Sequence, residues 1–162
     1  MPSRQKAKGN NFERTIAKHL SETLGGNFER VPTSGAMTGG LNAHILERLS
    51  DSQKLLLEGD LIPPDELPNL KIECKSLKKI SFSSFLTKNA TLDDWIEQAK
   101  SNEKLWFLIF KINNRGTFVA THEYFFKKFY VTSNYMYYNK SYIFPMENFF
   151  EQNIELISQL AK

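Results

Sequence analysis

The sequence predicts an α/β fold, a mixed central β-sheet flanked by helices, and three stretches carry this prediction. Apolar residues recur at every fourth position from Phe12 to Leu24, which is typical of an amphipathic helix. Apolar and polar residues alternate from Leu70 to Lys75, as they do in a strand with one covered face. Residues 105–110 are continuously apolar, which indicates a central strand covered on both faces.

The N-terminal half contains further elements around the first helix. We expect a basic arm over residues 1–9, a helix capped by Asn10 or Asn11, and a strand over residues 27–31. Helical spacing of leucine and isoleucine over residues 41–58 predicts an inserted helix, which is either a dimer contact or a lid over DNA.

The C-terminal half continues the same alternation of helix and strand. A helix is expected to begin at Thr91 or Asp93, and residues 113–116 have the composition of a hairpin turn. Residues 121–162 are expected to form an extension packed on the core. Within this extension the sequence predicts a helix capped by Thr121, an edge strand over residues 142–145 and a final helix over residues 146–160.

Composition limits the class of protein. The length of 162 residues fits a single domain spanning residues 1–162. No apolar run approaches the ~20 residues of a membrane span, and no apolar segment follows the basic N-terminus as in a secretory signal. The single cysteine, Cys74, cannot form an internal disulfide. These features suggest a cytoplasmic protein without a membrane partner.

Positive charge is concentrated at the N-terminus. The net charge is only +3, but the residues from Met1 to Lys18 include five lysines and arginines against one acid, Glu13. Such a segment, which includes Lys8, can follow a phosphate backbone, although a plain solvated terminus has the same composition.

A candidate site centres on two carboxylates and a lysine. Side chains of a strand alternate between its faces, so Glu73 and Lys75 are expected to share one face. Asp60 begins a second short apolar segment, and the turn-rich residues 63–69 are expected to fold that segment back beside the first. Asp60, Glu73 and Lys75 are then expected to lie in one pocket.

This set of groups suits phosphodiester hydrolysis. Asp60 and Glu73 supply hard oxygen ligands for Mg²⁺ or Mn²⁺, and the carbonyl of Cys74 can add another. Lys75 is placed to orient a water or to neutralise the scissile phosphate. Taken alone, Glu-x-Lys also fits a surface strand with one ion pair.

The order of the surrounding motifs resembles a known family. A Lys-Gly-Asn-Asn-Phe-Glu-Arg stretch opens the first helix at residues 8–14, and Arg-Val-Pro-Thr-Ser-Gly follows the first strand at residues 30–35. Gly-Asp at residues 59–60 and Glu-Cys-Lys at residues 73–75 complete the series. In this order the sequence resembles the archaeal-type Holliday-junction resolvases, also found in phages, of the PD-(D/E)xK nuclease superfamily. The resemblance implies a restriction-endonuclease-like nuclease fold over residues 1–162.

The same resemblance suggests roles for residues outside the central set. It implies that Glu13 assists metal binding and that Arg14 contacts phosphate. It places Arg30 at the DNA-facing end of the first strand and Ser34 in the active-site loop, where the hydroxyl helps to position the scissile strand. Many enzymes of this superfamily carry a polar helix residue near the site, and Gln98 is the candidate here.

The function expected from these observations is a Mg²⁺-dependent endonuclease that resolves four-way DNA junctions as a homodimer. The metal site follows from the residues, whereas the junction substrate and the dimer follow from the resemblance. One alternative is a repair or restriction-like endonuclease of the same superfamily. Another is a structure-selective DNA-binding module without catalysis.

Overall fold

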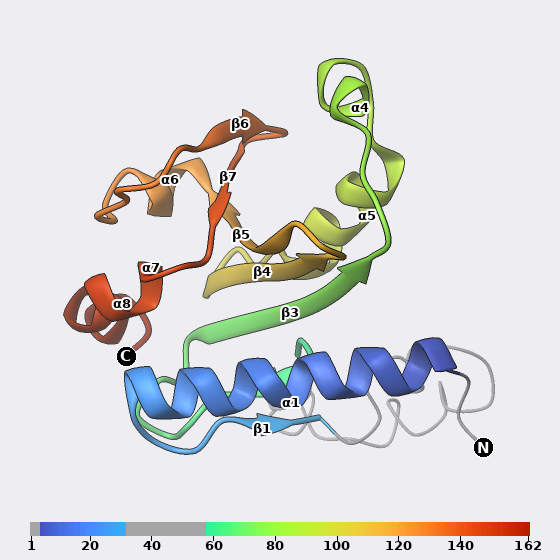
Figure 1. The fold of residues 1–162 in the computed structure, drawn as a ribbon. Helices are drawn as coiled ribbons and strands as arrows, with labels where there is room; N and C mark the ends of the chain where they lie inside the picture. Colours follow the sequence, from blue (N-terminus) through green and yellow to red (C-terminus); the bar gives the residue numbers. More distant parts are fainter. Residues whose placement is uncertain (1–3, 32–57) are drawn as a thin grey trace.

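The fold is built on one seven-stranded mixed sheet with the order β1-β2-β3-β4-β5-β7-β6 (Figure 1). The computed structural model describes residues 4–31 and 58–162. The strands in chain order are β1 (Glu29–Arg30), β2 (Leu61–Ile62), β3 (Leu70–Leu77), β4 (Leu105–Ile112), β5 (Gly116–His122), β6 (Met136–Tyr138) and β7 (Ser141–Pro145).

Helices cover both faces of this sheet, as the sequence predicted. The long first helix runs beside β1 and β3, with α7 and α8 next to it, while α5 packs against β3 and β4 on the other face (Figure 1). The helices are α1 (Arg4–Leu24), α4 (Phe82–Leu86), α5 (Ala90–Ala99), α6 (Glu123–Phe126), α7 (Phe149–Gln152) and α8 (Ile154–Leu160). No helix in the described ranges is long and apolar enough to cross a membrane.

The sheet is mixed because β3 and β4 are parallel, whereas every other neighbouring pair is antiparallel. Strand β4 lies fourth of the seven strands, which confirms the prediction from its continuous apolar run. Seven of its eight residues are buried, and six of these form the unbroken run from Leu105 to Phe110.

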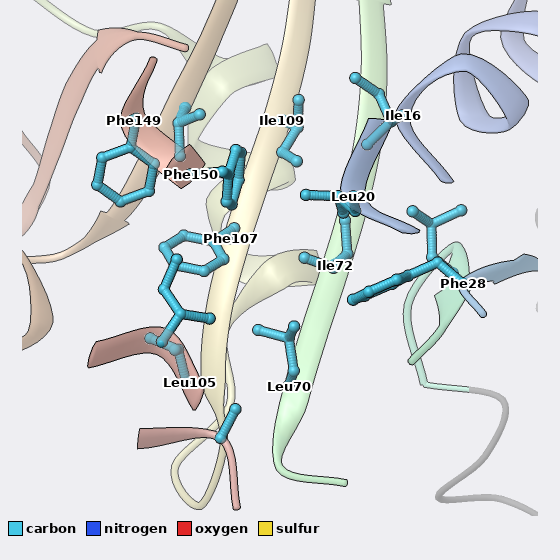
Figure 2. Close-up of a cluster of buried hydrophobic side chains, with 14 of the residues drawn as sticks. Ile16, Leu20, Phe28, Leu70, Ile72, Leu105, Phe107, Ile109, Phe149 and Phe150 are labelled. Atoms are coloured by element: carbon cyan, nitrogen blue, oxygen red, sulfur yellow. The ribbon is translucent and has the colours of Figure 1, made fainter. Parts of the chain in front are cut away.

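Two hydrophobic clusters lie on opposite faces of the sheet. On the face covered by α1, the side chains of Ile16 and Leu20 pack against Ile72, and Phe107 contacts Phe150 (Figure 2). On the other face, Leu92 and Ile96 of α5 pack against alternate residues of β4. The alternation of β3 is therefore confirmed, since Leu70, Ile72 and Cys74 join the first cluster and the residues between them face α5.

The first helix begins earlier than the sequence predicted. The sequence predicts a cap at Asn10 or Asn11 after a basic arm, but α1 already begins at Arg4. Arginine, glutamine, lysine and alanine all favour helix, so residues 4–9 extend α1 without a cap at Asn10. Similarly, α5 is capped by Asn89, whose side-chain oxygen accepts the N–H of Leu92, and not by Thr91 or Asp93.

The C-terminal third differs from the sequence-based prediction in three places. Thr121 does not cap a helix, because it lies in β5 with its hydroxyl donating to the Trp106 carbonyl at 2.9 Å, and His122 caps α6 instead. The strand expected at the edge, β7, is covered by the short strand β6. The expected final helix is interrupted at Asn153, whose side-chain amide donates to the carbonyls of Phe149 and Tyr130 at 2.8 Å each.

Candidate functional site

The backbone of Gly59 and Asp60 fixes the first carboxylate between two strands. The Asp60 N–H donates to the Ile72 carbonyl at 2.8 Å, and the Asp60 carbonyl accepts the N–H of Val31 at 2.9 Å. Gly59 has a φ of +82°, and a Cβ at this position would lie 2.5 Å from the Ile72 oxygen. Only glycine combines this backbone conformation with so close an approach to β3. The Gly-Asp pair is therefore a geometric requirement for placing Asp60.

Asp60 directly precedes β2 and lies beside Glu73 of the adjacent strand β3, as the sequence predicted. Leu61 is paired with Ile72 in the antiparallel β2–β3 ladder, and both side chains belong to the α1-side cluster. The preceding Asp60 and the following Glu73 therefore face the α5 side. The Asp60 Oδ2 atom accepts the N–H of Cys74 at 2.8 Å, which ties this carboxylate directly to β3.

Glu73 and Lys75 form an ion pair on the same face. The Lys75 Nζ atom lies 2.6 Å from the Glu73 Oε1 atom, and the two side chains are 23% and 9% exposed, respectively. A pair this shielded from water keeps more of its Coulomb attraction than a surface pair. The structure thus brings together the three residues that the sequence singled out.

The electrostatics of Asp60 are unusual for an aspartate. Its pKa is raised from 3.8 to about 7, chiefly by burial and next by the negative charge of Glu73, whereas the Cys74 N–H and Lys75 oppose the rise. A smaller rise comes from Glu13. Two acids held this close in a shielded pocket attract a cation, because a bound cation would relieve their repulsion.

The donor chemistry fits a Mg²⁺ or Mn²⁺ ion. Such ions are usually held by one or two carboxylates, with waters and substrate phosphate completing the shell. Asp60 and Glu73 supply the carboxylates, and the carbonyl of Cys74 lies in the chain between Glu73 and Lys75. Within residues 4–31 and 58–162 no group of three or more His, Cys, Asp or Glu side chains is gathered closely enough to hold a metal. Among the described residues, the Asp60 and Glu73 carboxylates are the pair whose chemistry fits such an ion.

Glu13 is engaged by Arg30, and this pairing was not foreseen. The Arg30 Nε atom donates to the Glu13 Oε2 atom, and a terminal guanidinium nitrogen donates to the Asn10 Oδ1 atom at 2.8 Å. Arg30 pairs with Leu61 across the β1–β2 ladder and therefore lies on the α1 side of the sheet. The contact joins residues 17 positions apart, so no local pattern in the sequence predicts it.

Lys71 is a further charged residue of this face that the sequence analysis did not single out. Its Nζ atom donates to the carbonyls of Gln98 at 2.8 Å and Lys100 at 3.0 Å, at the C-terminal end of α5. Burial lowers the pKa of this lysine. The alternation that marked Glu73 and Lys75 also includes Lys71, and that signal could have found it.

The residues predicted to contact DNA are spread over several surfaces. Arg14 and Lys8 are exposed on α1, and Lys8 borders a groove of about 480 Å³ together with Ser76 and Lys111. Gln98 is exposed on α5. Ser34 and residues 41–57 of the predicted insertion lie outside the described residues, so their predictions stay untested.

Cys74 has two separate roles in this region. Its thiol is buried among apolar side chains of the α1-side cluster, and burial raises the thiol pKa well above its usual value. A thiol of this kind is inert at neutral pH. The backbone N–H, by contrast, holds Asp60, so the residue acts at the site through its main chain.

The comparisons with known proteins agree with this geometry. Residues 4–160 match the model of a family described as "Phage putative PDDEXK endonuclease". The match therefore covers α1, the whole sheet and the C-terminal helices. No curated protein and no solved structure gives a significant match.

Proposed function

The chain belongs to the family of phage PDDEXK endonucleases, and from this premise we propose that it hydrolyses DNA phosphodiester bonds at Asp60, Glu73 and Lys75. The family is a nuclease family, and the mixed seven-stranded sheet with flanking helices is consistent with its restriction-endonuclease-like fold. The observation that carries the proposal is the convergence of two buried acids and one lysine from β3 and from the residue that precedes β2.

Each residue of the site has a role in this proposal. Asp60 and Glu73, with the Cys74 carbonyl, would hold a divalent cation. A bound Mg²⁺ or Mn²⁺ supplies a Lewis acid for the phosphate and lowers the pKa of a coordinated water. Lys75 donates to Glu73 and directs positive charge at the place where the scissile phosphate enters. The Asp60 carboxylate is held in orientation by the Cys74 N–H.

The positions of Glu13 and Arg30 change the roles proposed for them. The carboxylate of Glu13 is neutralised by the Arg30 guanidinium, so Glu13 supports metal binding indirectly, by lying close enough to affect Asp60. Arg30 in turn fixes α1 against β1. Arg14 and Lys8 are exposed on α1 and are the proposed phosphate contacts.

We take four-way junctions as the substrate and a homodimer as the active species. The order of motifs from residue 8 to residue 75 supports this choice, because it resembles that of junction resolvases. Paired cuts on opposite strands of a junction require two sites held apart, which a symmetric dimer supplies. Sedimentation equilibrium with and without junction DNA measures the stoichiometry, and a monomer on the cut junction would contradict the dimer.

A single cleavage assay tests the proposal. An end-labelled four-way junction and a linear duplex of the same sequence are incubated with Mg²⁺ or with EDTA, using the wild type, Glu73→Gln and the exposed control Glu103→Gln. We expect paired nicks on the junction alone, lost in EDTA and in Glu73→Gln but kept in the control. Equal cutting of both substrates would assign the site to a repair or restriction-like endonuclease. Binding of the wild type to either DNA without cutting in Mg²⁺ would favour a non-catalytic module.

A further inference from the structure

A pocket of about 620 Å³ opens on the α5 side of the sheet, beyond the C-terminal end of β3. Its lining residues come from the connection between β3 and α4, from the hairpin that joins β4 to β5, and from strands β6 and β7. None of the residues assigned to cleavage lines it. The pocket is therefore a separate feature from the metal site, although it shares the same face of the sheet.

Aromatic rings, together with isoleucine and methionine side chains, form the inner surface of this pocket. We call Phe85, Phe110 and Phe118 the aromatic wall. Phe110 is only 1% exposed and stacks on Phe118, with ring centroids 5.7 Å apart and an interplanar angle of 27°. Phe85 projects from the short helix α4 and is partly exposed. Phe110 therefore backs Phe118, and the partly exposed rings of Phe118 and Phe85 are the apolar surface that the wall offers to a flat ligand.

Positive charge surrounds the opening. We call Lys78, Lys79 and Arg115 the basic rim, and all of them are exposed. The described residues that line the pocket include no carboxylate, whereas the amides of Asn113 and Asn114 offer both donors and acceptors. Aromatic surface inside and cationic charge outside match a nucleobase joined to its phosphates.

The pocket lies next to the cleavage site on the same face of the sheet. Lys75 pairs with Phe110 in the parallel β3–β4 ladder, so the lysine of the site and this residue of the aromatic wall are neighbours. At a rise of about 3.3 Å per residue, Lys78 lies roughly 17 Å along the chain from Glu73. One DNA strand advances about 3.4 Å per nucleotide in a duplex, so a bound strand could span the two sites within about five nucleotides.

We propose that this pocket binds one unpaired nucleobase of the DNA substrate a few nucleotides from the cleaved bond. The base stacks on the aromatic wall, and the flanking phosphates lie against the basic rim. This inference rests on the proposed function, because it assumes that DNA lies across the site on the α5 face. It adds to that function a means of recognising DNA in which a base is free to leave its stack.

Equilibrium binding in EDTA tests the pocket without requiring cleavage. Three DNA probes of equal duplex length are compared by fluorescence anisotropy: a duplex with a single-stranded tail, the same duplex with a tail of abasic residues, and a blunt duplex. The wild type should bind the tail with bases roughly tenfold more tightly than the abasic tail, since stacking of a base on an aromatic ring has about this effect. Phe85→Ala should lose this difference.

The same helix supplies a matched control. Phe82 is 71% exposed on α4 and does not line the pocket, so Phe82→Ala should keep the tenfold difference. If Phe85→Ala fails to fold, Phe118→Leu keeps apolar bulk, removes the ring and carries the same comparison. Equal affinity of the wild type for both tails, or an unchanged difference in the ring variants, would overturn the inference.

The remaining outcomes separate this inference from the proposed function. Absence of metal-dependent cleavage on every substrate would overturn the proposed function and leave the base preference standing. Intact metal-dependent cleavage with no base preference would overturn this inference and leave the proposed function standing. Dimerisation of the wild type that Phe85→Ala abolishes would show that a second copy of the chain occupies the pocket, and it would also overturn the inference.

Discussion

Replacing Asp60 by asparagine should stabilise the metal-free protein at alkaline pH. Burial and Glu73 raise the pKa of the Asp60 carboxyl from 3.8 to about 7. The unfolded chain therefore releases this proton near pH 4, whereas the folded chain keeps it until near pH 7. The stability that the protonated Asp60 carboxyl contributes is complete below pH 4 and is lost as the pH rises through 7. A pKa shift of this size corresponds to a loss of roughly 4 kcal/mol from the free energy of unfolding of the wild type at pH 8.

Urea denaturation in EDTA from pH 4 to pH 8 measures this effect. An asparagine oxygen can accept the same hydrogen bond from the Cys74 N–H without carrying a charge into the pocket. The free energy of unfolding of Asp60→Asn minus that of the wild type should therefore increase by about 4 kcal/mol from pH 4 to pH 8. Parallel pH profiles for the two proteins would refute the electrostatic description of the pocket. The exposed Asp65→Asn should follow the wild type.

Addition of Mg²⁺ gives the same variant a second readout. A ligand that binds only the folded protein raises the free energy of unfolding, by about 2.7 kcal/mol at a hundred times its dissociation constant. At pH 8 the wild type should gain stability with Mg²⁺, and Asp60→Asn should gain little. An equal gain in both proteins would exclude Asp60 as a metal ligand, whether or not either protein cuts DNA.

Three further substitutions test other parts of the molecule. Gly59→Ala should lower the free energy of unfolding in urea by about 2 kcal/mol or more, because its Cβ would meet the Ile72 oxygen at a positive φ. The control Gly9→Ala in α1, where a Cβ has open space, should be neutral or stabilising in the same titration. Arg14→Ala should reduce the slope of log affinity against log salt by about one unit in DNA titrations, and an unchanged slope would place Arg14 off the DNA path. Asn153→Ala should cost about 3 kcal/mol in thermal or urea unfolding, because it removes a buried amide bonded to Tyr130 and Phe149, and the exposed Asn148→Ala should cost little.

The acids of the site could be predicted because their placement depends on short-range geometry. The alternation from Leu70 to Lys75 fixes which side chains share a face, and the turn at residues 63–69 is long enough only for an antiparallel return. Gly59 directly precedes Asp60, so the close approach to β3 is also encoded locally. The long apolar run of β4 similarly indicates a central position, since few other environments bury both faces of a strand.

The three wrong predictions in the C-terminal third depended on contacts between distant residues. The break between α7 and α8 follows from the hydrogen bonds of Asn153 with Tyr130, which lies 23 positions away. Strand β7 is not an edge because the short aromatic segment of β6 covers it, and three residues are too few to give a periodic signal. Threonine is a common helix cap, but the Thr121 hydroxyl donates instead to the carbonyl of Trp106 on the neighbouring strand.

The site lies where the sheet changes from antiparallel to parallel pairing, and this position links its chemistry to the stability of the fold. Asp60 is hydrogen-bonded on one side to Val31, which directly follows β1, and on the other to Ile72 of β3. Two residues before Glu73 and on the same face, Lys71 of β3 donates to carbonyls at the C-terminal end of α5, where a cation is favoured. Since the carboxylates repel each other across the β2–β3 pair, a cation that joins them also holds these strands together. Metal affinity and local stability of β2 should therefore rise and fall together, and hydrogen exchange of the Asp60 and Cys74 amides with and without Mg²⁺ measures that linkage.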